Sequence, residues 1–334
     1  MTSKPMDVKA LPKIDLHVHL DGALRPSTVA DLIRATGRPV PPDVESLCRV
    51  APDCRSLPEF LKTFEFFLPY LGSTDALRRA AAELCEDQAA DNVVYFETRF
   101  APTLWLSRGF KPEQAIEAAI AGLEEGAKKT GGKWGLILCG IRDFPPETTL
   151  TTVRLAYRYL VDGVVGVDLA GDERAHAVYH SAAFELARRL EIPITIHAGE
   201  AGPAENVRQA LDFDADRIGH GIHAADDPAI LARAVKREAT FEMCLTSNLQ
   251  TRCVASLDEH PFARFLREGV RVTLNTDDPG VQGSTLSQDF ALAAKQWGLT
   301  KDEFRTTLLH SAQAAFADES VRAHLRATIE AAWK

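Results

Sequence analysis

The segment from Ile14 to Gly22 combines residue types and a spacing that suit metal binding. It reads Ile-Asp-Leu-His-Val-His-Leu-Asp-Gly, with a polar residue at every second position. In a β-strand alternate residues share a face, so His17 and His19 project to the same side about 7 Å apart. Two such imidazoles can bind one metal ion, and the alternative is a histidine pair on a solvated strand face. Burying this polar face without a metal or a hydrogen-bond network is costly.

Composition and charge describe a soluble globular protein. The chain has 334 residues, of which 46% are hydrophobic and 25% are charged. Lys and Arg together number 38 and Asp and Glu 47, so the formal net charge is −9. An acidic protein repels polyanions, so nucleic acids and anionic membranes are poor candidate partners.

Cysteine spacing and the N-terminus predict a cytoplasmic protein. None of the six cysteines forms a C-x-x-C pair, which argues against a thiolate zinc site. The N-terminus has no apolar core of a secretory signal. The longest uncharged apolar run, residues 134–141, is far shorter than the ~20 residues that span a bilayer.

Short apolar runs that alternate with helical patterns predict eight β/α units. The predicted strands are 14–22, 93–100, 134–141, 164–171, 193–199, 217–220, 240–245 and 271–277. Eight units without a linker favour one (β/α)₈ TIM barrel domain over residues 1–334. A doubly wound sheet would need a glycine-rich G-x-G-x-x-G turn, and the sequence has none.

A segment at about residues 38–74 lies between the first and second strands as a predicted helical insertion. Residues 38–56 are rich in proline, and an apolar helix is predicted from Leu57 onward. The spacing of Phe60 and Phe64 alone favours core packing over a lid on a substrate site.

Polar residues at the strand ends supply a set of metal ligands. Barrel enzymes place their chemistry at the C-terminal ends of the strands. His17, His19, His197 and Asp277 all fall at such ends, and three imidazoles with one carboxylate suit zinc. Two-metal barrel hydrolases use a lysine after the fourth strand, but residues 161–175 contain none, so one metal per chain is expected.

Three further residues at the same rim suit acid–base chemistry. A bound divalent ion lowers the pKa of water from ~15.7 toward ~7 and so supplies hydroxide. Glu200 lies three residues beyond His197 and could carry protons without binding the metal. His220 and Asp278 could orient the hydroxide. Five other histidines lie in loop or helical patterns and are expected to be structural: His176, His180, His260, His310 and His324.

Five motifs between about residues 11 and 316 resemble those of the adenosine deaminase branch of the amidohydrolase barrels. Together, in this order and at strand ends, they are highly specific. They are Leu16-His-Val-His-Leu-Asp-Gly-Ala23, Val167-Asp-Leu-Ala-Gly-Asp-Glu173, His197-Ala-Gly-Glu200, Arg217-Ile-Gly-His-Gly221 and Leu274-Asn-Thr-Asp-Asp-Pro279.

The resemblance implies a role for each matching residue. The metal ligands would be His17, His19, His197 and Asp277, holding one Zn²⁺. Glu200 would protonate a purine ring nitrogen, while His220 and Asp278 position the hydroxide. The backbone N–H of Gly171 and the Asp278 carboxyl would bind the purine, and Asp21 with His19 would face the ribose. The resemblance also places Leu57, Phe60 and Phe64 beside the purine, which favours a lid.

The resemblance implies hydrolysis of adenosine and 2′-deoxyadenosine, small-molecule purine nucleosides, to inosine and 2′-deoxyinosine with release of ammonia. Two departures leave a 5′-modified adenosine such as 6-aminodeoxyfutalosine as an alternative: Leu245, where the family often has proline, and residues 280–283. Adenine is less favoured, because adenine-specific relatives tend to carry Glu where this chain has Asp21. A non-catalytic nucleoside-binding barrel is disfavoured, because Glu200, His220 and Asp278 are all present. The sequence assigns no role to Asp15.

Overall fold

Eight parallel strands form the centre of the protein in a computed structural model that describes residues 7–334, without the side chains of residues 106–108. They are β1 (Lys13–His19), β2 (Val93–Phe100), β3 (Lys133–Ile141), β4 (Val164–Ala170), β5 (Thr195–Ala198), β6 (Arg217–His220), β7 (Thr240–Met243) and β8 (Val272–Leu274). Hydrogen bonds join neighbouring strands in the order β1-β2-β3-β4 in one group and β5-β6-β7-β8 in the other. Isolated parallel bridges between Val18 and Asp277 and between Val167 and Ile194 connect the two groups at both seams. The predicted TIM barrel is therefore confirmed.

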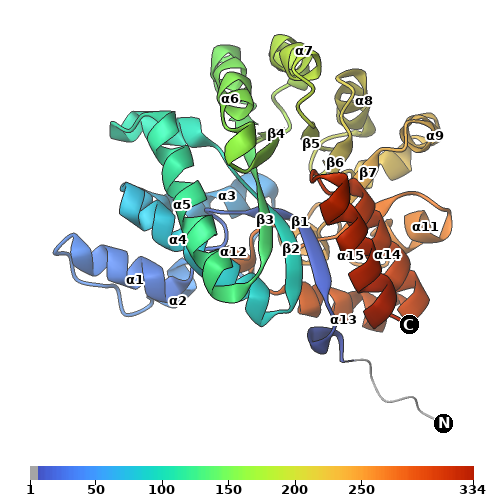
Figure 1. The fold of residues 1–334 in the computed structure, drawn as a ribbon, viewed down its shortest axis with the longest axis horizontal. Helices are drawn as coiled ribbons and strands as arrows, with labels where there is room; N and C mark the ends of the chain where they lie inside the picture. The colour runs from blue at the N-terminus through green and yellow to red at the C-terminus, as the bar shows by residue number, and fades with distance from the viewer. Residues whose placement is uncertain (1–6) are drawn as a thin grey trace.

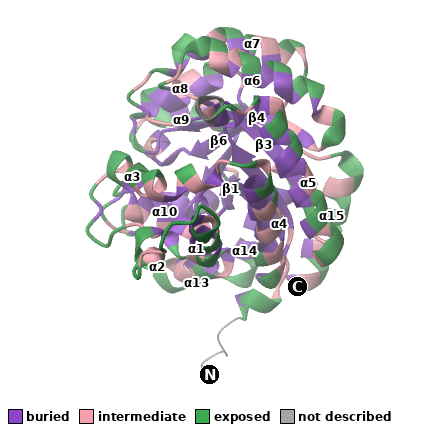
Figure 2. Ribbon diagram, turned by 90° about the vertical axis from the view of Figure 1, so that its left-hand side faces the viewer, coloured by how far each residue is buried: buried purple, intermediate pink, exposed green. Residues whose placement is uncertain are grey.

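Helices surround the strands as an outer ring (Figure 1). They are α1 (Pro26–Ala35), α2 (Val44–Leu47), α3 (Leu57–Phe67), α4 (Thr74–Ala90), α5 (Pro112–Thr130), α6 (Pro146–Arg158), α7 (Ser181–Arg189), α8 (Ala204–Asp212), α9 (Pro228–Lys236), α10 (Leu245–Gln250), α11 (Phe262–Arg267), α12 (Pro279–Gln282), α13 (Leu286–Trp297), α14 (Lys301–Ala314) and α15 (Glu319–Ala332). Figure 2 shows buried strands enclosed by helices whose outer faces are exposed. The strands are near-continuous apolar runs because both faces of the sheet are covered.

The insertion between β1 and β2 is partly helical, as predicted. It contains α2, α3 and the 3-10 helix η2 (Leu68–Leu71). Ser56 caps α3, because its side chain accepts a hydrogen bond from the backbone N–H of Glu59. Further 3-10 helices are η1 (Val8–Ala10), η3 (Pro102–Arg108), η4 (Leu160–Asp162), η5 (Ala177–His180) and η6 (Ile222–Asp226). The first six residues of the predicted 1–334 domain lie outside the described residues.

The last two strands are shorter than predicted. β7 ends at Met243 and β8 at Leu274, whereas the predicted strands extend to residues 245 and 277. Leu245 is instead the first residue of α10 and is fully buried in the core. Asp277 has a left-handed backbone, with φ of 72°, which no strand residue adopts. Both strands end early because the chain turns there to place polar side chains.

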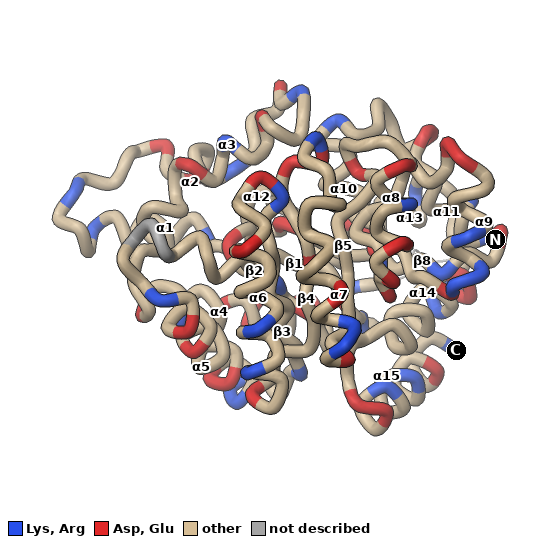
Figure 3. Tube along the Cα trace, turned by 90° about the horizontal axis from the view of Figure 1, so that it is seen from above, with Lys and Arg blue, Asp and Glu red and all other residues tan. Residues whose placement is uncertain are grey.

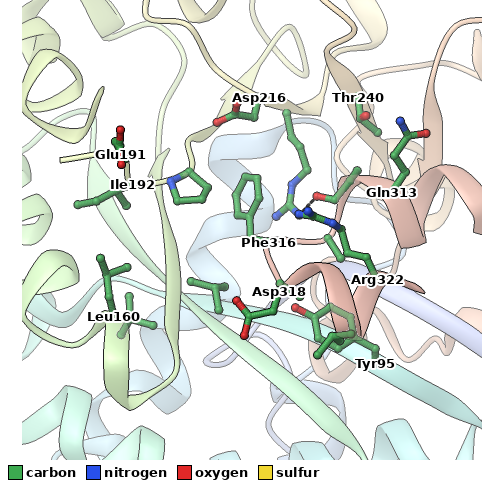
Figure 4. A pocket seen from close by; sticks show the side chains of 18 of the residues that line it. Tyr95, Leu160, Glu191, Ile192, Asp216, Thr240, Gln313, Phe316, Asp318 and Arg322 are labelled. Carbon is green, nitrogen blue, oxygen red and sulfur yellow. Dashed lines mark hydrogen bonds between the residues drawn. The ribbon is translucent and has the colours of Figure 1, made fainter. Parts of the chain in front are cut away.

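A cavity of about 1190 Å³ lies at the end of the barrel where β3, β4 and β7 begin, and Figure 4 shows it from close by. The Phe316 ring covers the buried Arg217 guanidinium, 3.6 Å from ring centre to carbon. The Phe316 backbone N–H donates to Glu97 Oε1 at 2.6 Å, and Arg217 donates to the Ala314 carbonyl at 3.0 Å. This end of a TIM barrel serves stability, and the candidate ligands lie at the opposite end.

Charged residues of both signs are interspersed on the outer helices (Figure 3). Ion pairs such as Arg78–Glu125, at 2.9 Å, join α4 to α5 across the surface. Exposed pairs of this kind each contribute roughly 0–1 kcal/mol. Within residues 7–334, none of the helices has the length and apolar content to cross a membrane.

Candidate active site

Four side chains converge at the C-terminal end of the barrel. His17 and His19 come from β1, His197 comes from β5, and Asp277 follows β8. One nitrogen or oxygen atom from each lies within 4.8 Å of those of the other three. Asp277 Oδ1 is 3.2 Å from His17 Nε2 and 3.3 Å from His19 Nε2. The structure thus brings together the four residues that the sequence predicts as ligands.

Buried carboxylates orient two of these imidazoles. His17 Nδ1 lies 2.7 Å from Glu242 Oε2, and His197 Nδ1 lies 2.9 Å from Asp168 Oδ2. Each Nδ1–H donates to its carboxylate, so each Nε2 presents a lone pair to the centre of the site. Arg99 is fully buried between the two carboxylates and donates to both, at 3.2 Å to Asp168 and 3.0 Å to Glu242. These residues hold the rings ready to bind a cation.

The atoms at the centre of the cluster fit one metal ion. His17 Nε2 is buried and has no hydrogen-bond partner, and the Nε2 atoms of His19 and His197 face each other at 3.2 Å. A divalent cation would accept the lone pairs of these nitrogens. A second grouping replaces His19 and His197 with His220 and Cys244. In that grouping burial raises the pKa of the Cys244 thiol well above its usual range.

Glu200 lies beside the cluster and is buried. Burial raises the pKa of its carboxyl well above the usual range, and the charge of Asp277 raises it further. Asn248 and Thr251 contact Glu200 Oε1 at 3.4 and 3.3 Å, and His220 Nε2 lies 3.5 Å from Oε2. A raised pKa favours the protonated carboxyl, which can donate a proton to a bound molecule.

Asp278 is a second carboxyl with a raised pKa. Burial is the main cause, and the charges of Asp277, Asp21 and Glu200 add to it. Its Oδ1 atom is buried without a hydrogen-bond partner. A Cβ atom on Gly22 would lie 1.7 Å from this oxygen, so only glycine fits beside it. Burial also raises the pKa of Asp21 to about 6.

Asp15, which the sequence leaves without a role, joins β1 to β8 and α4. Its carboxylate accepts a hydrogen bond from the Thr276 hydroxyl at 2.6 Å and from the Gln88 amide at 3.2 Å. It also accepts from the backbone N–H of His17 at 3.3 Å. The polar residues of β1 therefore differ in role, because Asp15 binds neighbouring elements while His17 faces the other candidate ligands.

The residues predicted to border a purine differ in burial. Phe60 is 1% exposed and belongs to the core, as its spacing predicts. Leu57 and Phe64 are half-buried and pack against that core. Gly171 follows β4 with a φ of 96°, a conformation that L side chains rarely adopt. A lid role for the three apolar residues remains a prediction.

Sequence reasoning missed Glu173, which fixes the loop that carries Glu200. Its carboxylate accepts from the backbone N–H groups of Gly199, Glu200 and Ala201 at 2.8, 2.7 and 3.1 Å. The Asn206 side chain donates to it at 2.8 Å. Only its place two residues beyond Gly171, in a motif, signals this role.

Sequence reasoning also missed α10, the short helix after β7. Its Ser247 hydroxyl donates to Asp277 Oδ2 at 2.6 Å, and its Asn248 reaches both Glu200 and His220. A run of six residues carries no helical period that the sequence alone reveals. The signal that was available is the polar pair that follows a buried strand.

Comparisons with known proteins identify the family. A family model described as Adenosine deaminase matches residues 12–332. An adenosine deaminase of Enterococcus faecalis is 37% identical over 330 residues, which cover 98% of each chain.

Solved structures have the same fold. The N6-mAMP deaminase of Arabidopsis is 32% identical with a TM-score of 0.89, over 97% of this chain and 99% of that one. An amidohydrolase of Burkholderia ambifaria with bound Zn is 26% identical with a TM-score of 0.89, over 99% and 94% of the two chains. The chain therefore belongs to the adenosine deaminase family and is a hydrolytic deaminase.

Proposed function

We propose that this enzyme deaminates adenosine and 2′-deoxyadenosine with the help of one Zn²⁺. The observation that carries the proposal is the buried Glu200 carboxyl, with its raised pKa, beside four convergent candidate ligands. The Enterococcus relative named adenosine deaminase supports the choice of substrate. The reaction adds water at C6 of the purine and releases ammonia, leaving inosine or 2′-deoxyinosine.

The proposed zinc site consists of His17, His19, His197 and Asp277. Nitrogen and oxygen donors in this number suit zinc, and the Burkholderia neighbour contains bound Zn. A divalent ion held there would lower the pKa of water enough to supply hydroxide at neutral pH.

The chain's own residues supply the proton transfers. Glu200 would donate its proton to the ring nitrogen next to the attacked carbon, which makes that carbon more electrophilic. His220 and Asp278 would hold the attacking oxygen, because both are buried and lie beside the ligands. The raised pKa of Asp278 favours its protonated form, which can donate a hydrogen bond as well as accept one.

The remaining residues would bind the nucleoside. We assign the purine to the Gly171 backbone N–H and to the apolar residues Leu57, Phe60 and Phe64. Asp21, with His19, would bind the ribose hydroxyls, since a carboxylate accepts two hydrogen bonds from a diol. A cytoplasmic location is also proposed, and it is supported by six unpaired cysteines, five of them buried.

Substrate profiling tests the proposal. We expect the purified zinc-loaded enzyme to convert adenosine and 2′-deoxyadenosine, with kcat/KM at least about 10²-fold above that for adenine or 6-aminodeoxyfutalosine. Ultraviolet absorbance of the purine follows each reaction. A preference for aminodeoxyfutalosine would identify the 5′-modified substrate instead. Binding of adenosine without turnover would identify a nucleoside-binding barrel.

A further inference from the structure

A hydrogen-bond chain that begins at a backbone amide reaches His220. The Phe262 backbone N–H donates to His260 Nδ1 at 3.2 Å. A backbone amide can only donate, so Nδ1 of the neutral ring is the acceptor and its hydrogen is on Nε2. Burial lowers the pKa of His260 to about 3, which keeps the ring neutral. His260 therefore presents an N–H donor from Nε2.

That donor fixes the orientation of the Asn248 amide. His260 Nε2 lies 3.2 Å from Asn248 Oδ1, which accepts the hydrogen bond. The amide nitrogen of Asn248 then faces His220 Nδ1 at 3.2 Å and Glu200 Oε1 at 3.4 Å. Its two hydrogens match these two acceptors. The opposite orientation would set a donor against the His260 N–H.

The Asn248 amide in turn fixes the hydrogen of His220. Because Nδ1 accepts from Asn248, a neutral His220 carries its hydrogen on Nε2. Nε2 is the atom that faces the site, 3.5 Å from Glu200 Oε2. The His220 ring centre lies 4.9 Å from that of His17 and 5.3 Å from that of His197, so His220 borders the candidate ligands.

We propose that Asn248 and His260 are positioning residues that hold His220 in the Nε2–H tautomer, so that His220 donates a hydrogen bond to the attacking oxygen. The catalytic consequence rests on the proposed deaminase function, whereas the tautomer itself does not. An Nε2 that bears hydrogen has no lone pair for a metal. The hydrogen-bond chain thus also distinguishes the two possible ligand groupings. It excludes His220 as a metal ligand and so favours the grouping that contains His19 and His197.

Nitrogen-15 NMR of histidine-labelled, zinc-loaded enzyme reads the tautomer directly. We expect the wild-type His220 signals, assigned by their loss in His220→Gln, to show hydrogen on Nε2 and none on Nδ1. Asn248→Asp offers only acceptor oxygens, so its His220 should carry hydrogen on Nδ1. Hydrogen on Nδ1 in the wild type, or an unchanged tautomer in Asn248→Asp, would overturn the proposal.

Kinetics test the consequence with a matched pair at position 260. His260→Leu removes the donor, and we expect kcat to fall about 10²-fold or more with bound zinc retained, since a misplaced histidine hydrogen severely slows other hydrolases. His260→Gln restores an N–H donor and should recover most of that loss. Equal kcat in His260→Leu and wild type would contradict the proposal.

A control variant and the NMR measurement separate a loss of kcat in His260→Leu from misfolding and from failure of the proposed function. His310→Gln removes a part-buried histidine that contacts the Val272 carbonyl at 3.2 Å, away from the cluster, and should keep wild-type kcat. If His260→Leu does not fold, the wild-type and Asn248→Asp tautomers still decide. Failure of the wild type to deaminate adenosine would contradict the proposed function, while the NMR result would still confirm or overturn the tautomer.

Discussion

Three of the four candidate ligands are held by residues distant in the sequence. His17 is bound to Glu242, His197 to Asp168, and Asp277 to Ser247. Such partners fix the direction of a ligand's lone pair, and losing one typically weakens metal binding about 10- to 100-fold. We therefore expect the metal affinity of the proposed site to depend on residues that do not bind the metal themselves.

Ser247→Ala tests this dependence with a small change. The substitution removes the hydrogen bond to Asp277 Oδ2 and leaves little empty space. We expect the zinc dissociation constant, measured by competition with a chelator, to rise about tenfold or more. Ser46→Ala removes an exposed hydroxyl in the insertion and serves as a control. Equal zinc affinity in the Ser247 variant and the control would contradict the role of Ser247 in holding Asp277 as a zinc ligand.

At the residue scale, the sequence predicts ligands better than their supports. His17 and His19 are recognisable because strand alternation relates them, and His197 and Asp277 because both fall at strand ends. Glu242 lies in the middle of the β7 pattern and looks like any strand residue. Its contact with His17 spans 225 positions, so no local spacing indicates it.

At the element scale, the loops after β4 and β5 act as one unit. Glu173 follows Gly171 on the first loop, and its carboxylate binds three backbone N–H groups of the second, around Glu200. It therefore links the two groups that we assign to the purine, the Gly171 backbone N–H and the Glu200 carboxyl. This linkage depends on the acceptor capacity of both carboxylate oxygens.

We expect Glu173→Gln to lower the rate of the reaction while the protein remains folded. An amide would turn an N–H₂ group toward backbone donors and lose at least one hydrogen bond, worth about 1–3 kcal/mol in a buried site. We expect kcat to fall about tenfold or more, with zinc content retained. Glu117→Gln, at a carboxylate that accepts from the Tyr159 hydroxyl on the outer helices, is the matched control. Equal kcat in both variants would rule out this role for Glu173.

A buried acid of α13, Asp289, contacts the start of α10 and makes stability depend on pH. Asp289 Oδ1 accepts from the backbone N–H of Thr246 at 3.1 Å, and its Oδ2 has no partner. Burial raises its pKa from 3.8 to about 7. The folded state therefore binds this proton more tightly than the unfolded state, and the stabilisation is lost as pH rises toward 7.

Asp289→Asn should remove this part of the pH dependence. We expect the stability of the variant relative to wild type to increase between pH 5 and pH 8 by on the order of 2 kcal/mol. Urea unfolding at both pH values, with zinc loaded in both proteins, measures the difference. A difference in stability that is the same at both pH values would contradict the raised pKa.

At the scale of the whole molecule, the two ends of the barrel have different tasks. A ladder of buried charges runs between them, because Arg217 pairs with Glu97 and Glu242, and Glu242 also binds His17. The Phe316 ring covers this ladder at the end remote from the proposed ligands. We therefore expect changes at that cover to affect stability rather than chemistry.

Phe316→Ala tests this division. The substitution removes a cation–π contact and exposes a buried ion pair to water, so we expect the free energy of unfolding to fall by about 1–2 kcal/mol. The kcat for adenosine at a temperature where the variant is folded should stay within about twofold of wild type. A large loss of kcat with unchanged stability would contradict the division.

The sequence predicts the barrel because each strand is a short apolar run followed by a helix. It predicts the ends of β7 and β8 less well, since the predicted strands extend to residues 245 and 277 while the backbone turns after Met243 and Leu274. Closure of the barrel also needs Gly280, where a Cβ atom would lie 2.5 Å from the Leu24 carbonyl. That contact joins the first and last units, so only the folded chain reveals it.

The most direct test of the account is the rate of ammonia release from adenosine by wild type and Glu200→Gln, with zinc measured in the same samples. Glutamine keeps the shape of the side chain but cannot donate the proton. We predict rapid turnover by the wild type, a loss of kcat of about 10²-fold or more in the variant, and equal zinc content in both. The account would be contradicted if Glu200→Gln turned over adenosine at the wild-type rate, or if the zinc-loaded wild type left adenosine unchanged.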